Sequence, residues 1–112
     1  MMASATAAQA EVEKHIVGSS TEYKIEEDSA TLLSAAALTV EIDRVEQTGG
    51  EVKLWLSAWQ KKGAKRSVYF HYPEKEGRHT YDLGRFGQSS AKIDVTADRL
   101  TSLTVTAPNA AH

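Results

Sequence analysis

The middle of the chain alternates between apolar and polar residues, with the period of two that is typical of half-buried β-strands. The alternation is unbroken from Leu38 to Asp43 and resumes after the turn at Gly49 and Gly50. Six segments are predicted as strands on this pattern: residues 38–43, 52–59, 68–72, 79–83, 91–95 and 103–106.

The pattern is weaker toward the start of the chain. Residues 21–25 alternate and predict one more strand, and residues 15–17, before Gly18, are a candidate for another. Residues 27–37 are ambiguous, because their Leu and Ala content favours a helix while they lead directly into a strand; we expect a short helix or a loop there. Strands at this regular spacing favour an all-β, single-domain antiparallel β-sandwich of about seven short strands, with a small β-barrel as the alternative.

The chain has 112 residues, which is the length of one domain. Residues 1–10 contain no charged group, so we expect a disordered leader before a single β domain at 11–107 and a disordered tail at 108–112. Ala8-Gln9-Ala10 has the spacing of small residues found at signal-peptidase sites, but no basic and apolar segments precede it. We therefore expect a cytoplasmic protein; export is the alternative if residues 1–10 are the remnant of a signal peptide.

Composition excludes several classes of protein. The chain has no cysteine, so it can form neither a disulfide framework nor a thiolate metal site. The formal charge of −2 does not suit a nucleic-acid-binding tail. The chain contains no apolar run long enough for a membrane-spanning helix.

The registers of two hairpins can be predicted by keeping the apolar residues on one face, since a one-residue slip would reverse every side chain. The second hairpin then pairs Ala58 with Val68, Leu56 with Phe70 and Leu54 with Tyr72, across a loop of Lys62, Gly63 and Ala64. The first hairpin pairs Val40 with Leu56 and Ile42 with Leu54, which places Asp43 opposite Lys53 as an ion pair.

These registers place large aromatic side chains on the face of the sheet that should be polar. The predicted binding residues on that face are Trp55, Trp59, Tyr69, His71 and Lys53, with Trp55 opposite His71. Several large aromatic residues on one solvent face require an explanation, whereas a single exposed one does not.

Three interpretations of this face are open. The chain itself could cover it, with residues 27–37 or 21–25 folded over the rings. It could instead be an interface for a protein partner or for a second copy of the chain, where Trp and Tyr are the usual anchors. As a third interpretation, Trp55, Trp59 and Tyr69 could stack sugar rings while Lys53, Glu41 and His71 bind their hydroxyls.

A basic cluster lies at the tip of the second predicted hairpin, beside the aromatic residues. Its members are Lys61, Lys62, Lys65 and Arg66. Basic and aromatic groups side by side on a sheet are typical of proteins that bind single-stranded nucleic acid. The slightly acidic chain as a whole makes nucleic acid an unlikely partner, and lysines at a hairpin tip also keep sheets soluble.

No catalytic constellation and no metal motif is visible. A turn near residue 75 would bring His71 and His79 together, and Asp82 or Glu74 could complete a metal site, but two ordinary surface histidines are the simpler interpretation. We expect no catalytic residue, no metal and no cofactor. The sequence therefore predicts a non-catalytic binding module: first for a protein partner or as a homo-oligomer, then for carbohydrate, and last for single-stranded nucleic acid.

Overall fold

The structure, a computed structural model, describes residues 11–61, 63–97 and 99–109. The strands in this part of the chain are β1 (Val12–Val17), β2 (Ser20–Ala30), β3 (Leu32–Ala35), β4 (Leu38–Thr48), β5 (Glu51–Gln60), β6 (Arg66–Pro73), β7 (Arg78–Phe86), β8 (Ser89–Thr96) and β9 (Arg99–Pro108). A short 3₁₀ turn, η1 (Glu74–Glu76), connects β6 to β7. There are thus nine strands where about seven were expected, and several are longer than predicted.

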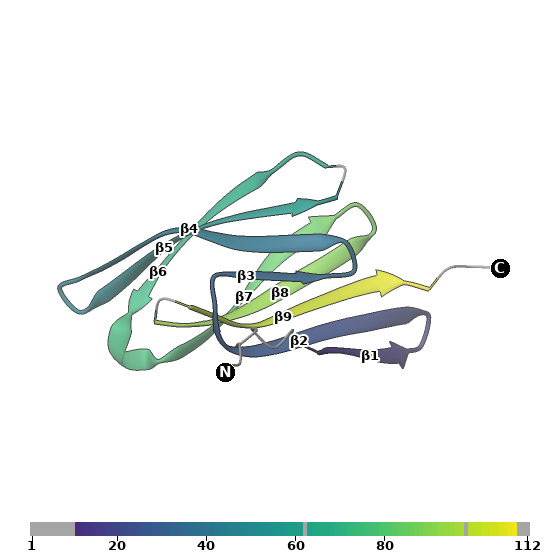
Figure 1. Cartoon of the computed structure of the whole chain (residues 1–112), viewed down its shortest axis with the longest axis horizontal. Coiled ribbons are helices and arrows are strands. Elements are labelled where there is room, and N and C mark those ends of the chain that lie inside the picture. Colours follow the sequence, from purple (N-terminus) through teal and green to yellow (C-terminus); the bar gives the residue numbers. More distant parts are fainter. Residues whose placement is uncertain (1–10, 62, 98, 110–112) are drawn as a thin grey trace, which may run out of the picture.

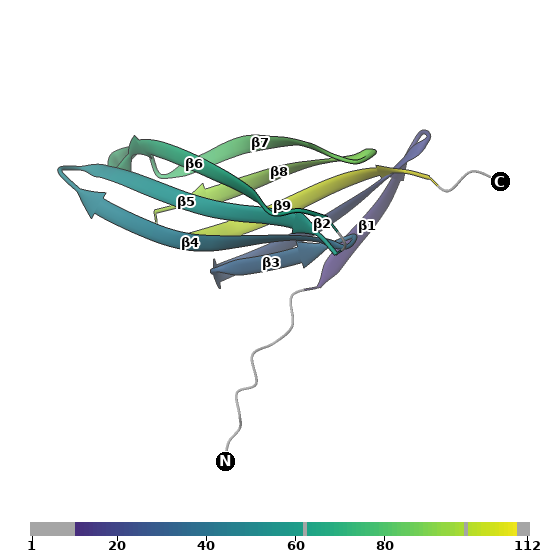
Figure 2. The ribbon, with the colours of Figure 1, turned by 90° about the horizontal axis from the view of Figure 1, so that it is seen from above.

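The strands form two antiparallel sheets that pack as layers (Figures 1 and 2). The five-stranded sheet A has the order β1-β2-β9-β8-β7, and the four-stranded sheet B has the order β3-β4-β5-β6. Within the described ranges the sheets stay separate, which confirms the β-sandwich and shows that the barrel alternative is wrong. β6 and β7 lie along one side of the sandwich, while β1 lies at the other side (Figure 2).

The core lies between the inward faces of the two sheets. In β5 every second residue from Val52 to Ala58 is buried, as the alternation predicts. The largest fully buried side chains are Leu38, Leu54, Leu56, Ile93, Leu100, Leu103, Val40, Val52, Val95 and Val105. Because both sheets contribute such side chains, the inner face of each sheet buries the apolar residues of the other.

The short helix expected near residues 27–37 is wrong. β2 continues to Ala30, and β3 pairs with β4 immediately afterwards. In β3, Leu33 and Ala35 are buried while Leu32 and Ser34 are exposed, which is the period of a strand. The helix propensity of this segment is a weak preference, and burial of alternate side chains beside β4 outweighs it.

Both predicted hairpin registers are wrong by two residues, and because the error is even, the assignment of faces is right. Ala58 lies opposite Arg66 and Leu56 opposite Val68, so the last two residues of β5, Trp59 and Gln60, extend beyond the start of β6. Gly49 and Gly50, both with positive φ, make a two-residue turn between β4 and β5. A two-residue loop with two left-handed positions matches the twist of paired strands and so sets this register.

The predicted Asp43–Lys53 pair is also wrong, because the two-residue error alone would place Asp43 opposite Trp55, and a β-bulge at Asp43 then takes this residue out of the pairing. The residue opposite Lys53 on β4 is Glu46, and on β6 it is His71. Trp55 consequently lies opposite Tyr69 and not opposite His71.

The ends of the chain fall partly outside the described residues. The predicted leader at residues 1–10 and the last three residues of the predicted tail lie outside them. β9 runs to Pro108, and the Asn109 N–H donates a 2.9 Å hydrogen bond to the carbonyl of Ser19. No helix in the described ranges is long and apolar enough to cross a membrane.

Candidate binding face

The outer face of sheet B carries the aromatic residues predicted from the sequence. Arg44, Trp55 and Tyr69 lie side by side on β4, β5 and β6, and we call them the aromatic row. The guanidinium carbon of Arg44 is 4.8 Å from the centroid of the Trp55 ring. The rings of Trp55 and Tyr69 are 5.0 Å apart and tilted by 41°, within the range of favourable aromatic pairs. His71 continues the row at 5.9 Å from Tyr69.

The aromatic row is accessible to solvent. Tyr69 is 46% exposed, His71 is exposed, and Trp55 and Trp59 are half-buried. β2 belongs to sheet A and β3 lies beside β4 in sheet B, so residues 21–25 and 30–37 do not lie over the rings (Figures 1 and 2). The interpretation that residues 27–37 or 21–25 fold over this face is therefore wrong.

The bulge at Asp43 decides which residue of β4 meets Trp55. Before the bulge, Ile42 pairs with Leu56, and continued regular pairing would place Asp43 opposite Trp55. The extra residue moves Arg44 into that position, so a cation stands against the electron-rich indole face in place of a carboxylate. The Asp43 carboxylate instead accepts a 2.5 Å hydrogen bond from the Ser57 hydroxyl.

A shallow hollow of about 340 Å³ opens next to the aromatic row, lined by Asp43, Arg44, Trp55, Leu56, Ser67, Val68 and Tyr69. Leu56 and Val68 pair with each other and face the core, so they contribute main chain to the floor of the hollow. The next pair on the outer face is Ser57 and Ser67, whose small side chains leave this space open beside the rings.

Trp59 lies at the end of β5 nearest the hairpin tip. The ammonium group of Lys65 is 4.7 Å from the centroid of its ring. Lys61 and Lys65 are exposed, whereas the predicted residue Lys62 lies outside the described part of the chain.

Arg66 does not belong to a basic cluster at the tip. Its guanidinium crosses to sheet A, donating hydrogen bonds to the main-chain carbonyls of Leu83 (3.0 Å) and Arg85 (2.6 Å). It also lies 3.8 Å from the centroid of the Phe86 ring. Arg66 is therefore bonded to the other sheet and does not extend the exposed surface of Lys61 and Lys65.

The two histidines considered for a metal site do not face each other. β6 and β7 belong to different sheets, so His71 lies on the outer face of sheet B while His79 packs 4.3 Å from the ring of Tyr72, a residue of the core. His79 Nε2 is 3.0 Å from a carboxylate oxygen of Glu76. Among the described residues no group of three His, Cys, Asp or Glu side chains could hold a metal ion.

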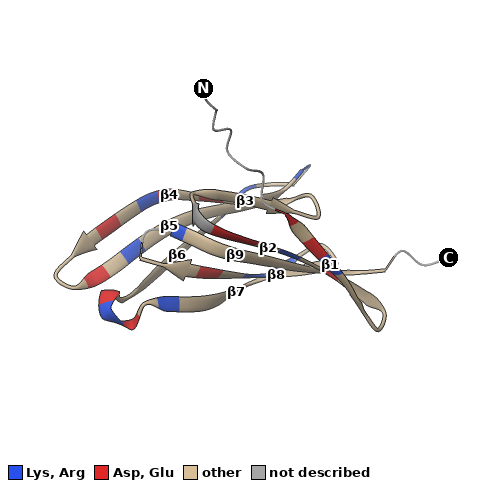
Figure 3. Ribbon diagram, turned by 60° about the horizontal axis from the view of Figure 1, so that its bottom comes forward, with Lys and Arg blue, Asp and Glu red and all other residues tan. Residues whose placement is uncertain are grey.

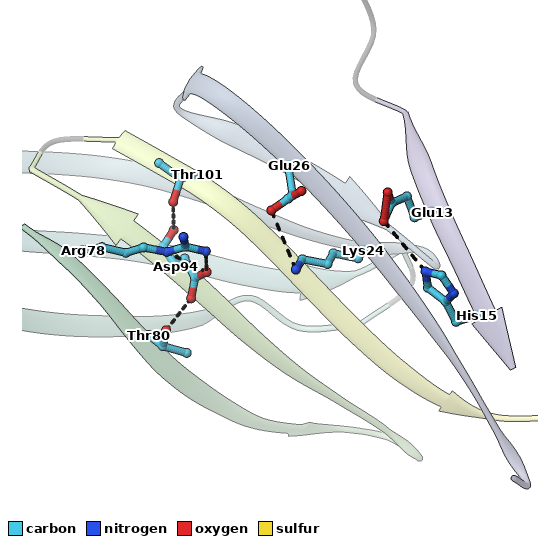
Figure 4. Close-up of polar contacts among 8 residues, drawn as sticks. All are labelled: Glu13, His15, Lys24, Glu26, Arg78, Thr80, Asp94 and Thr101. Carbon is cyan, nitrogen blue, oxygen red and sulfur yellow. Dashed lines mark hydrogen bonds and ion pairs between the residues drawn. The ribbon is translucent and has the colours of Figure 1, made fainter. Parts of the chain in front are cut away.

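The outer face of sheet A is different in character, because it carries several clusters of polar groups bonded to one another (Figure 4). Asp94 accepts hydrogen bonds from Arg78 and from Thr80, whose hydroxyl is 2.5 Å from the carboxylate. Burial raises the pKa of the Asp94 carboxyl, but the hydrogen bonds from Thr80 and Arg78, with the charges of Arg78 and Lys24, outweigh it and hold that pKa below its ordinary value. Charged residues of both signs are spread over the two sheets (Figure 3). The aromatic row is thus the feature that distinguishes sheet B.

Arg44 is not among the binding residues predicted from the sequence. A signal was present, because the apolar positions of this segment shift from even numbers at Val40 and Ile42 to an odd number at Val45. Such a change of phase within one strand indicates a β-bulge.

Comparisons of the chain with protein-family models, with curated proteins and with solved structures find no match.

Proposed function

We propose that the protein is a non-catalytic protein-binding module, and that the outer face of sheet B binds an acidic surface of a partner protein. The observation that carries this proposal is the aromatic row, in which Arg44, Trp55 and Tyr69 contact one another across three strands. Trp, Tyr and Arg are the residues that most often dominate the energy of protein interfaces. Their mutual packing holds the side chains in place before binding, which lowers the entropy cost of association.

The charges around the aromatic row favour an acidic partner. Two carboxylates beside the row are already bonded within the sheet, Asp43 to Ser57 and Glu46 to Arg44. Lys53 and Lys65 also face outward from this sheet, and in the described ranges neither lies within ion-pair distance of a carboxylate. A partner that supplies carboxylates would form ion pairs with these lysines. Two copies docked face to face would instead bring like charges together.

The two other ligand classes receive less support from the geometry. Sugar rings and nucleic-acid bases need an open ring face for stacking, but Trp55 has Arg44 on one side and Tyr69 on the other, and Lys65 lies over Trp59. Nucleic acid also needs a run of available cations, and Arg66 is bonded to the other sheet.

A displayed library of random peptides tests the proposal without a known partner. We expect the full chain to enrich peptides that contain Asp or Glu beside aromatic residues. Their binding should weaken by about tenfold or more with Tyr69→Ala or Trp55→Ala, which corresponds to the loss of a hot-spot residue. Affinity should also fall as salt is added, because the lysine contacts are exposed.

Ile16→Ala is the matched control, because it removes a large exposed apolar side chain from the other sheet. Peptides should bind this variant as tightly as the parent chain. The proposal is overturned if no peptide is enriched, or if Tyr69→Ala and Ile16→Ala affect binding equally. Binding to a glycan array that depends on Trp55 would replace it with the carbohydrate hypothesis.

A further inference from the structure

β1 is a sheet edge that exposes apolar residues on both of its faces. All six of its residues are exposed, including Val12 at 49%, Ile16 at 73% and Val17 at 62%. It pairs with β2 on one side, and no strand of the described residues pairs with its other side. An edge strand of this kind offers a row of main-chain donors and acceptors to another strand.

The exposure of β1 follows from the unequal number of strands in the two sheets. Val12 lies opposite Ile25 and Ile16 opposite Thr21, and both of these partners are buried. Val12 and Ile16 therefore continue the core face of sheet A. Sheet B ends at β3, which packs against β2 and β9, so the core face extends one strand beyond its cover.

The other three sheet edges are protected. β6 and β7 lie beside each other, and Arg66 of β6 donates hydrogen bonds to two main-chain carbonyls of β7. β7 also contains a bulge at Gly84, whose φ is +85°, and bulges disfavour pairing with another strand. β3 is only four residues long. Among the described edges, β1 is the one that remains open to a partner.

We propose that a second copy of the chain pairs with β1, antiparallel and about a two-fold axis at Lys14, to join two A sheets into one continuous sheet. In an antiparallel pair, residues opposite each other must lie on the same face. With the axis at Lys14, Val12 meets Ile16 of the other copy on the inner face, and Glu13 meets His15 on the outer face. Symmetry makes each of these contacts occur twice.

The contact between Glu13 and His15 selects this register. Glu13 and His15 already lie 3.8 Å apart within one chain, on the outer face (Figure 4). In the dimer, each Glu13 carboxylate would also meet a His15 imidazole of the other copy, so the two pairs would form one cluster of alternating carboxylate and imidazole groups. An axis at His15 would instead place two histidines against each other and Glu13 against Val17, which loses both favourable contacts.

Lys14 lies on the axis, where two ammonium groups could repel each other. In the structure its ammonium is 5.8 Å from the centroid of the Tyr23 ring on β2, so the side chain is directed away from the open edge. β1 can therefore pair with its second copy while the two Lys14 ammonium groups stay apart. This proposal does not depend on the proposed function, because β1 and the aromatic row lie on different sheets.

Cysteine cross-linking of the full chain tests the register, since the protein has no cysteine of its own. With the axis at Lys14, the two copies of residue 14 are directly opposite, with Cβ atoms about 4.5–5.5 Å apart, close to disulfide geometry. We expect Lys14→Cys to form a disulfide-linked dimer at least about tenfold faster than Leu32→Cys, an exposed cysteine on the β3 edge. His15→Cys should also be slower, because its two copies are diagonal neighbours about 7–8 Å apart.

A charge exchange tests the same contacts without cysteine. In sedimentation velocity over a concentration series, we expect Glu13→Lys and His15→Glu each to weaken the dimer about tenfold, because the first removes both carboxylates that meet His15 and the second places two pairs of carboxylates against each other. The double variant restores opposite charges and should restore the dimer, and Tyr69→Ala should leave it unchanged. The proposal is overturned if the parent chain stays monomeric at all concentrations, if the double variant is no better than either single variant, or if Lys14→Cys links no faster than Leu32→Cys.

Discussion

The Nη1 atom of Arg66 in β6 donates a 3.0 Å hydrogen bond to the main-chain carbonyl of Leu83 in β7. This bond joins the edge strand of sheet B to the edge strand of sheet A, at the side of the sandwich where η1 connects β6 to β7. A second hydrogen bond to Arg85 and the contact with the Phe86 ring hold the guanidinium flat against sheet A. Arg66 is therefore a structural residue.

Replacement of Arg66 by alanine should lower the free energy of unfolding by about 1–3 kcal/mol, because two charge-assisted hydrogen bonds and a cation–π contact are lost at a partly exposed site. Arg66→Lys should lose most of the same free energy, because an ammonium group cannot reach two carbonyls with the fork of a guanidinium. Urea denaturation measures both. Arg85→Ala is the control and should stay within about 0.5 kcal/mol of the parent chain. Equal effects at the two positions would contradict the structural role of Arg66.

We expect the hydrogen bond between Ser57 and Asp43 to stabilise the bulge in β4. Ser57 is 5% exposed, so Ser57→Ala should cost about 1 kcal/mol of unfolding free energy and loosen the position of Arg44 against Trp55. Denaturant titration monitored by tryptophan fluorescence measures the unfolding free energy, and the emission of the folded state reports the change around Trp55. Ser67→Ala, at the exposed position opposite Ser57, should change neither. Unchanged emission and stability in Ser57→Ala would show that the bulge is held in another way.

The stability of the fold should decline in acid partly through Asp94. The folded state holds the pKa of this carboxyl below its ordinary value of about 4, so the unfolded chain binds the proton more readily. The contribution is complete above that ordinary value and is lost as the pH falls through the lower pKa of the folded state. Asp94→Asn should be about 1 kcal/mol less stable at neutral pH, and the difference from the parent should shrink on acidification.

Glu51→Gln, which changes an exposed carboxylate on β5, is the control for that pH series. It should follow the parent chain at neutral pH. A constant difference between Asp94→Asn and the parent across the acid range would contradict the lowered pKa.

The two indoles should behave as partly accessible groups in solution. In Trp59→Phe, the emission of Trp55 should be quenched by acrylamide, and in Trp55→Phe the same should hold for Trp59, because each side chain is half-buried. Lys65→Ala should increase the quenching of Trp59, since the ammonium group covers its ring. Blue-shifted emission without quenching would mean that something covers this face, and it would count against the proposed function as well.

Much of the architecture follows from local pattern. Alternation from Leu38 onward predicts strands, the spacing of strands predicts a sandwich, and the parity of apolar positions assigns Trp55, Trp59 and Tyr69 to the outer face. These predictions are right because a strand presents alternate residues to opposite faces whatever its partner is. The exposure of the face could not be predicted, because it depends on where residues 27–37 go.

Tertiary structure alone decided the remaining features. The strand character of β3, the pairing of Ala58 with Arg66 and the bulge at Asp43 set which residues meet across strands, and each departs from the local expectation. The physical reason is that contacts between distant segments determine register and strand pairing. Helix propensity and the alternation of apolar residues carry no information about those contacts. The sequence by itself thus determined the faces of this protein, and the fold decided which residues stand together on them.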